Sequence, residues 1–262
     1  MSDPSRSAIQ SALPYAEKIR AVSTDQPFRW LAAGWRDFRA AGSVSIAHGL
    51  VFMMAGFALT LGLVAAGLTY LIAPLIAGFM LVGPALTVGF YAISRDLETG
   101  RQPTSAAAFA AWRANPAPLL GLGLMLVFFL VVWMRFAAMV FAICFPFVGL
   151  DVQSLLNASL FTADGLTFLA VGSVVGAGMA AIAFTLGAFS LPLLLDRKVG
   201  IFEALVTSVV AVAINARTMA VWASLVVLFT AAGLAAAFVG LAITLPLIGH
   251  ATWHAYRAVI RP

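Results

Sequence analysis

A run of 51 residues, from Val44 to Ser94, carries no Lys, Arg, Asp or Glu. Its only ionisable side chains are His48, Tyr70 and Tyr91. A stretch of this kind is long enough for two helices of about 20 residues across a hydrocarbon core of about 30 Å. The whole chain agrees, since 63% of its residues are hydrophobic and 10% are charged. The sequence therefore predicts an all-α, polytopic membrane protein and excludes a soluble globular domain.

The apolar segments and the polar gaps between them give the expected domain organisation. We place six spans, at about 44–68, 70–94, 117–136, 165–195, 217–237 and 239–258, within a single membrane domain over 43–262. Residues 136–150 are apolar too, and the sequence leaves open whether they cross the membrane, re-enter it or lie at its surface. Residues 1–26 are expected to be a disordered tail, because they are polar and lack a periodic pattern.

The positive charges indicate the orientation of these spans. Of the 15 Lys and Arg residues, 14 lie before the first span, in the gaps 95–113 and 197–217, or at and beyond the end of the last span. Cytoplasmic segments carry such an excess, so both termini are expected in the cytoplasm. The exception is Arg135, which reaches the outer headgroups or, if its helix continues, needs an acidic partner. The net charge of +5 thus reflects topology and anionic lipid, and no nucleic-acid partner is expected.

Residues 27–42 are expected to form an amphipathic helix at the membrane surface. Phe28, Leu31, Trp35 and Phe38 recur three or four positions apart, as the apolar face of a helix requires. Tryptophan favours the headgroup region, and arginine favours the phosphates. The residues expected at the lipid interface, here and near the end of the sixth span, are Trp30, Trp35, Arg36, Trp253 and Arg257.

Two polar gaps share a layout that predicts a parallel internal repeat. Each gap has an Asp at the end of a span, a Gly in the following turn and an Asn just before the next span. The matched positions are Asp96, Gly100 and Asn115, which recur 100 residues later as Asp196, Gly200 and Asn215. Small residues spaced along the spans predict close helix packing, at Gly62, Gly172, Gly176 and Gly240.

The sequence offers no catalytic residues, but three histidines are candidates for a binding site. Hydrolase and phosphate-binding motifs are absent, and the carboxylates lie at the ends of the spans rather than within them. Cys144 is the only cysteine, which excludes cysteine-cluster metal sites. His48, His250 and His254 would share one leaflet if the first and sixth spans are neighbours, where they could bind a metal ion or haem, or form structural hydrogen bonds.

Three segments of the chain resemble a known family. They are 30–38 (WLAAGWRDF), 91–100 (YAISRDLETG) and 249–257 (GHATWHAYR). All three are similar to those of bacterial predicted integral membrane proteins of the domain of unknown function 2189 family. The resemblance extends over about residues 28–260, and it implies a multi-span helical fold in the inner membrane of Gram-negative bacteria. It implies no activity.

These observations favour a non-catalytic membrane protein that contacts other membrane proteins or forms a homo-oligomer. We expect an accessory or assembly subunit of a membrane complex, including an energy-transducing one, because small-residue stripes and a surface helix accompany the lack of membrane carboxylates. Two alternatives stay open. One is a small-solute channel or uniporter, favoured by the repeat and the proline-bearing spans. The other is a haem or metal binder that uses the three histidines.

Overall fold

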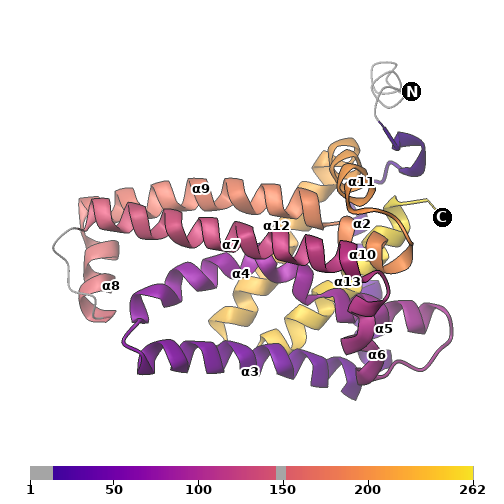
Figure 1. Cartoon of the computed structure of the whole chain (residues 1–262), viewed down its shortest axis with the longest axis horizontal. Coiled ribbons are helices and arrows are strands. Elements are labelled where there is room, and N and C mark those ends of the chain that lie inside the picture. The colour runs from indigo at the N-terminus through magenta and orange to yellow at the C-terminus, as the bar shows by residue number, and fades with distance from the viewer. Residues whose placement is uncertain (1–13, 146–151, 262) are drawn as a thin grey trace.

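The computed structural model describes residues 14–145 and 152–261, and most of them are helical (Figure 1). In chain order the α-helices are α2 (Gln26–Ala41), α3 (Ser43–Ala65), α4 (Ile72–Leu86), α5 (Val88–Glu98), α6 (Ser105–Ala110), α7 (Pro116–Cys144), α8 (Val152–Phe161), α9 (Ala163–Gly187), α10 (Ser190–Asp196), α11 (Ile201–Ile214), α12 (Ala216–Ala235) and α13 (Leu241–Val259). Short 3-10 turns, η1 (Ala16–Lys18), η2 (Thr69–Leu71) and η3 (Ala111–Arg113), connect some of them. The expected all-α architecture is confirmed.

Five helical segments of the described chain are long and apolar enough to cross a membrane. They are Ser43–Ala65, Thr69–Glu98, Pro116–Cys144, Ala163–Asp196 and Ala216–Ala235. α13, which was expected as a sixth span, is not among them. Its C-terminal half carries His250, His254 and Arg257, and these lower its hydropathy. A multi-pass helical membrane protein is thus confirmed, while the count of six stays a prediction.

Two of the five spans are interrupted near one end. α4 gives way to α5 at Thr87, three residues after Pro84, and α9 gives way to α10 just before Pro192. Proline cannot donate the hydrogen bond that continues a helix, so breaks at these sites are expected. α5 and α10 are nevertheless almost entirely buried, which places both short pieces inside the bundle.

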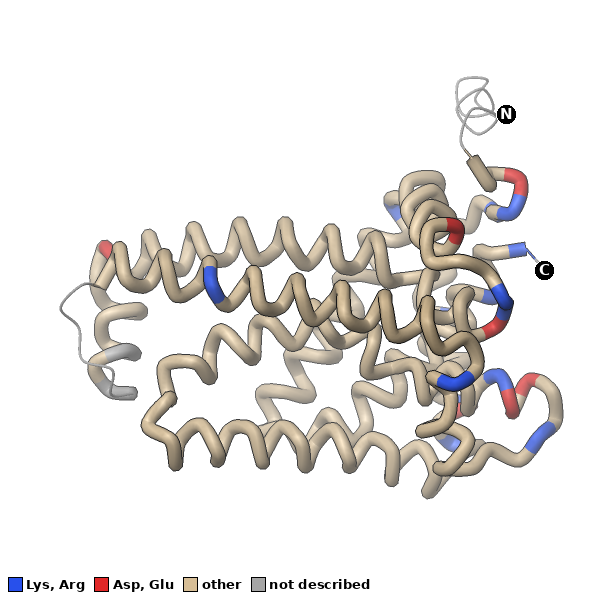
Figure 2. The backbone as a smooth tube through the Cα atoms, in the orientation of Figure 1, with Lys and Arg blue, Asp and Glu red and all other residues tan. Residues whose placement is uncertain are grey.

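Most of the charged residues lie at one end of the bundle, which we call the charged end (Figure 2). The described N- and C-terminal segments and the loops that follow α5 and α10 all lie there. α8 lies at the opposite end, next to the start of α9 (Figure 1). The remaining lengths of α3, α4, α7, α9 and α12 carry few charges, and we call them the apolar half.

The helix α2 is present as expected, but one face of it is buried inside the bundle. A Cβ atom on Gly34 would lie 2.6 Å from the backbone nitrogen of Ala251, so α2 and α13 are in very close contact. Trp30 is only 2% exposed, and its ring meets the edge of the Trp222 ring at 5.7 Å. Trp253 is buried as well. These two tryptophans therefore lie in the interior rather than at the lipid interface, whereas Trp35, Arg36 and Arg257 are exposed.

The N-terminal segment is ordered from residue 14 onward, which differs from the expected disorder of 1–26; residues 1–13 lie outside the described part. Arg20 N–H donates to Val259 O at 2.8 Å, and Arg261 N–H donates to Lys18 O at 2.7 Å. Ile19 between them is buried. The apolar Ile19 and these backbone hydrogen bonds bring the two ends of the described chain together.

The third span is one continuous helix, α7, which passes Arg135 and ends at Cys144. Residues 136–144 therefore extend the span, and 146–150 lie outside the described residues. Arg135 is exposed on this helix. It lies 19 residues from Pro116, or about 28 Å at 1.5 Å per residue, which is close to the far boundary of a hydrocarbon core.

The four glycines expected at helix contacts fall into two pairs. A Cβ on Gly176 would lie 3.0 Å from the Trp133 ring, and one on Gly240 would lie 2.7 Å from the Cα of Gly233. These two glycines lie where helices approach closely. At Gly62 and Gly172 an added Cβ would meet nothing within 4 Å, so these positions face open space in the isolated chain.

Candidate functional site

His250 lies at the centre of a buried polar cluster in the charged end. Its Nε2 is 2.8 Å from Ser45 Oγ on α3, and its Nδ1 is 2.8 Å from Ser94 Oγ on α5. The imidazole is 0% exposed. Gly249 permits this close contact, because a Cβ there would lie 2.6 Å from the Cβ of Phe90. One histidine of α13 therefore joins two other helices.

The cluster continues from Ser94 to the carboxylate of Asp37 on α2. The Ser94 hydroxyl lowers the pKa of Asp37, which places it beside that carboxylate, and His254 Nε2 lies 2.8 Å from Asp37 Oδ2. A serine hydroxyl has one proton, and a carboxylate only accepts. We therefore assign the proton of His250 to Nδ1, which donates to Ser94, while Nε2 accepts from Ser45. Every polar atom in this chain of contacts then has a partner.

Asp37 is the carboxylate in which this chain of hydrogen bonds ends. Burial alone would raise the pKa of Asp37, but the hydrogen bonds from His254 and Ser94 outweigh that effect, and the pKa lies below its usual 3.8. Hydrogen bonds to the charged form stabilise it. Asp37 therefore holds α2 onto α5 and α13 as an ionised group.

His48 lies next to this cluster but does not join its hydrogen bonds. Its Nδ1 is buried without a partner among the described residues. The ring of Phe90 packs edge-on against both His48, at 4.8 Å, and His250, at 5.6 Å. An apolar ring thus contacts both imidazoles. The described residues contain no group of three or more His, Cys, Asp or Glu that could hold a metal ion.

Two carboxylates fix the end of α13 in the charged end. Glu98, at the end of α5, accepts from Trp253 Nε1 and from Arg257 Nε, both at 3.0 Å. Asp196, at the end of α10, accepts from the Tyr256 hydroxyl at 2.7 Å. Trp253 and Arg257, which were expected to contact lipid, therefore both bind Glu98, although Arg257 is exposed and Trp253 is buried. From the sequence alone, an aromatic or basic residue near the end of a span that contacts lipid cannot be distinguished from one that binds another part of the protein.

The residues of the expected repeat lie in comparable places with different local geometry. Asp96 forms an ion pair with Arg101 at 2.7 Å, whereas Asp196 accepts from the Tyr256 hydroxyl and forms a longer ion pair with Arg257 at 3.6 Å. Gly100 has a φ of +71°, the left-handed region, whereas Gly200 has a φ of −77°. The glycine is thus required for its backbone only in the first copy.

Asn115 and Asn215 resemble each other more closely. Each immediately precedes a span, α7 or α12, and each binds the backbone of a neighbouring segment. Asn115 Nδ2 donates to Val199 O at 3.0 Å. Asn215 Nδ2 donates to Arg20 O at 3.1 Å, and its Oδ1 accepts from Val22 N–H at 2.8 Å. The two asparagines therefore tie loops of the charged end to the start of a span.

Sequence reasoning identified His250 and His254 but missed the residues that bind them. Ser45 and Ser94 are small polar residues in apolar runs, and the spacing of Ser45 and His48 places both on one side of α3. That spacing is a usable signal. Nothing local marks Asp37, because its role depends on the burial of α2 against α13.

The cluster contains the residue types of a nucleophilic site, but a substrate could not reach them. Ser45 and Ser94 each share a hydrogen bond with an imidazole, as a serine nucleophile does with its base. Both hydroxyls are buried, however, and both ring nitrogens of His250 are occupied. The arrangement can hold helices together and pass a proton along a chain of hydrogen bonds. It offers neither an exposed nucleophile nor a free ring nitrogen on His250.

Comparisons with known proteins support the fold rather than an activity. No curated protein and no solved structure matches the chain. Residues 71–196 match the model of a family described as "Predicted integral membrane protein (DUF2189)", which confirms the resemblance over that part of the chain, including the segment 91–100. The match runs from η2 to α10, so it includes Ser94 and Glu98 but none of the three histidines. The chain is thus a helical, multi-pass integral membrane protein that matches the DUF2189 family over residues 71–196.

Proposed function

We propose that this protein is a non-catalytic accessory or assembly subunit that acts by contacting other proteins within the membrane. The resemblance to bacterial proteins supports a location in the inner membrane, and the proposal includes both termini in the cytoplasm and α13 as a sixth span. The positive charges of the charged end support that orientation (Figure 2). The proposal assigns the function to helix surfaces rather than to a reaction centre.

The observation that carries the proposal is the low burial of α9. In the most apolar 18-residue window of the span Ala163–Asp196, 6% of the residues are buried, against 17–28% in the other four spans. α9 contacts α7, α8, α4 and α11, and many of its residues are nevertheless exposed. Its outward stripe is formed by Val171, Val174, Gly178 and Ile182, which are spaced as one helix face requires. Small and β-branched residues of this kind favour close helix–helix contact in lipid.

The histidine cluster supports the same proposal from the opposite direction. Its polar atoms bind one another and join α2, α3, α5 and α13, so they act in the structure of this chain. The alternative of a haem or metal site would require Ser45 or Ser94 to release His250. The alternative of a solute channel would need a polar route, whereas the cavity found between the spans has mostly apolar walls. We therefore favour the accessory role over both.

The test is co-purification of partner proteins with single variants of α9. Gly178→Leu adds a side chain on the outward stripe, where a Cβ meets nothing within 4 Å. Gly62→Leu on α3 is the matched control, because its site is equally open. We expect G178L to lower the amount of co-purified membrane protein by about tenfold, and G62L to leave it unchanged. The measurement is quantitative mass spectrometry after purification in mild detergent.

The same purified samples can also contradict the proposed accessory role. A wild-type chain that migrates alone in mild detergent, without a partner or a second copy, argues against the accessory role. Partner loss with G62L rather than G178L would move the contact from α9 to α3. Native mass spectrometry of the wild type separates a homo-oligomer from a complex with other proteins.

A further inference from the structure

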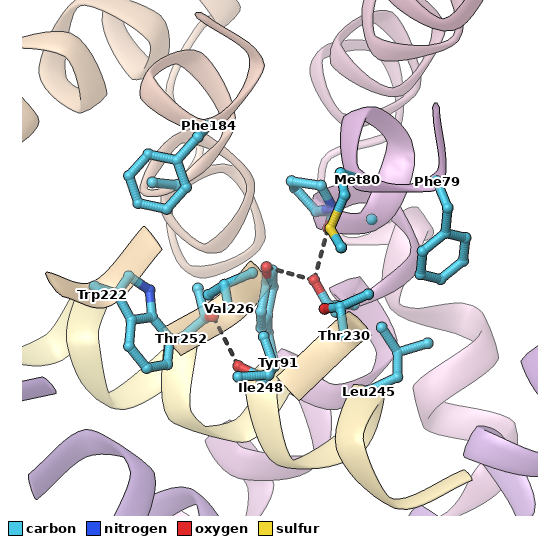
Figure 3. A pocket seen from close by; sticks show the side chains of 14 residues that line it. Phe79, Met80, Tyr91, Phe184, Trp222, Val226, Thr230, Leu245, Ile248 and Thr252 are labelled. Atoms are coloured by element: carbon cyan, nitrogen blue, oxygen red, sulfur yellow. Dashed lines mark hydrogen bonds between the residues drawn. The ribbon is translucent and has the colours of Figure 1, made fainter. Parts of the chain in front are cut away.

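A cavity of about 70 Å³ lies between two pairs of packed helices in the apolar half (Figure 3). On one side α4 packs against α9, and on the other α12 packs against α13. Thr87 at the α4–α5 break lines the cavity, nine residues or about 13 Å before Asp96 at the charged end. The cavity is therefore at the depth of the acyl chains if the charged end lies at the membrane surface.

The walls of the cavity are mostly apolar and partly aromatic. Phe79 and Met80 come from α4, Phe184 from α9, and Trp222 and Val226 from α12 (Figure 3). Gly83 also lines the cavity from α4, and it leaves free space there, because a Cβ at this position would meet nothing within 4 Å. A volume of about 70 Å³ has room only for the end of an aliphatic chain, and each methylene there that leaves water contributes to binding.

Hydroxyl groups from different helices supply the polar part of the lining. Thr87 Oγ1 is 2.8 Å from Pro84 O and 2.6 Å from the Tyr91 hydroxyl. The Thr87 hydroxyl has one proton, and the Pro84 carbonyl can only accept it. Tyr91 therefore donates to Thr87, which leaves a lone pair of the Tyr91 oxygen as a free acceptor.

Thr230 provides the matching donor. It lines the same cavity from α12 and is only 7% exposed (Figure 3). Its hydroxyl makes no hydrogen bond to another described residue. This hydroxyl faces the cavity, so a ligand there that accepts its proton supplies the hydrogen bond that the described residues do not.

We propose that this cavity binds the hydroxyl end of a neutral amphiphile whose long aliphatic chain extends out of it. A hydroxyl both donates and accepts, so it satisfies the free acceptor on Tyr91 and the free donor on Thr230 together. No charged side chain lines the cavity, so an anionic or cationic group at this depth would stay unpaired. The proposal concerns this chain alone and does not depend on a partner at α9.

The probe that tests the proposal is palmityl alcohol with a diazirine in its chain, added to the full-length protein in nanodiscs. After irradiation we expect labelled peptides that contain Met80, Phe184 or Val226. Palmityl phosphate with the same diazirine should label these peptides at least about tenfold less, because its charge finds no counter-ion in the cavity.

Two variants with matched controls test whether the probe binds in the cavity and whether Thr230 recognises its hydroxyl group. Val226→Phe fills the cavity and should lower labelling about tenfold, since it displaces about two methylene groups of the probe. Val227→Phe, at the 51% exposed neighbouring residue, should leave labelling unchanged. Thr230→Val should lower labelling by the alcohol about fivefold, and leave labelling by the same chain without a hydroxyl unchanged.

The outcomes that overturn the proposal are equally specific. Equal labelling of V226F and V227F would show that the probe binds the general protein surface. Labelling by palmityl phosphate as strong as by the alcohol would remove the assignment to a neutral ligand. If Thr230→Val weakened the alcohol and the hydrocarbon alike, the hydroxyl would have no role in recognition.

Discussion

The charged end and the apolar half of this molecule are held together by different interactions. In the charged end, hydrogen bonds between side chains join helices that are far apart in the sequence, as Ser45, Ser94 and Asp37 do with the histidines of α13. In the apolar half the helices meet through apolar side chains and small residues, and much of their surface faces outward. Lipid competes for apolar surface, whereas it offers few partners to a buried hydroxyl or imidazole.

This difference indicates which region contributes more to the free energy of unfolding. Packing between apolar helices has no hydrophobic advantage inside a bilayer, because lipid tails are equally apolar. A buried polar group that loses its partner, in contrast, retains its full desolvation cost. Substitutions in the charged end should therefore cost more free energy of unfolding than substitutions of equal size in the apolar half.

The largest effect is expected for His250→Ala. The change leaves Ser45 and Ser94 without their imidazole partner and opens a cavity in a fully buried site. We expect the free energy of unfolding to fall by about 3–4 kcal/mol. Val174→Ala, at a residue of α9 that is 73% exposed, should change it by less than about 0.5 kcal/mol. Reversible unfolding in mixed micelles measures both, and equal losses would contradict the comparison.

A smaller loss is expected for Asn215→Ala. This side chain bonds Arg20 O and Val22 N–H, so its removal frees the N-terminal segment from the start of α12. We expect a loss of about 2–3 kcal/mol and faster hydrogen exchange around Val22. The matched change Asn115→Ala, which breaks bonds of 3.0 and 3.4 Å to one loop, should cost about half as much. A larger loss for N115A would reverse this ranking.

The next effect depends on pH and concerns Asp37→Asn. We expect a loss of about 1–2 kcal/mol at neutral pH, because the charge-assisted bonds to His254 and Ser94 weaken. The pKa of Asp37 in the folded protein lies below 3.8, so its contribution is complete above that pH and is lost as the pH falls through the folded value. The difference between wild type and D37N should therefore be constant from about pH 7 to 5 and shrink below about pH 4. A difference that disappears already near pH 6 would rule out Asp37 as its source.

A still smaller loss is expected in the apolar half, for Trp133→Phe, although it exceeds that of the exposed control Val174→Ala. Trp133 Nε1 donates to Pro74 O at 2.8 Å, and the ring fits against Gly78 and Gly176. Phenylalanine keeps most of the packing but loses the hydrogen bond, so we expect a loss of about 1 kcal/mol. Thermal unfolding of W133F beside H250A provides the ranking, which fails if W133F proves the more damaging of the two.

Much of the fold follows from the sequence alone. The charge-free run from Val44 to Ser94 predicts the first two spans, and the structure has helices over 43–65 and 69–98. Pro84 indicates where the second span breaks, because proline removes a donor whatever the tertiary context. The neighbouring positions of His250 and His254 in the charged end follow from helical periodicity and span order. These features depend on composition and local geometry, which a single sequence contains.

The partners within the site could not be predicted in the same way. Trp30 and Trp253 have the composition of lipid anchors, yet both are buried, because α2 packs against α13 and Glu98 accepts from Trp253. Asp37 is one of several charged residues on α2 and becomes distinct only when that helix lies beside His254. Which helix faces meet is decided by the packing of distant segments, and no periodicity in the chain reports it.

The most direct test of the account is the state of the His250 imidazole in the full-length protein. Nitrogen-15 NMR of histidine-labelled protein in nanodiscs distinguishes the two neutral tautomers from the charged ring. The account predicts, at neutral pH, a neutral His250 with its proton on Nδ1, and a spectrum that does not change when zinc or haem is added. A proton on Nε2, a charged ring, or a shift of the His250 signals on adding metal would contradict a cluster whose polar atoms are all used inside the protein.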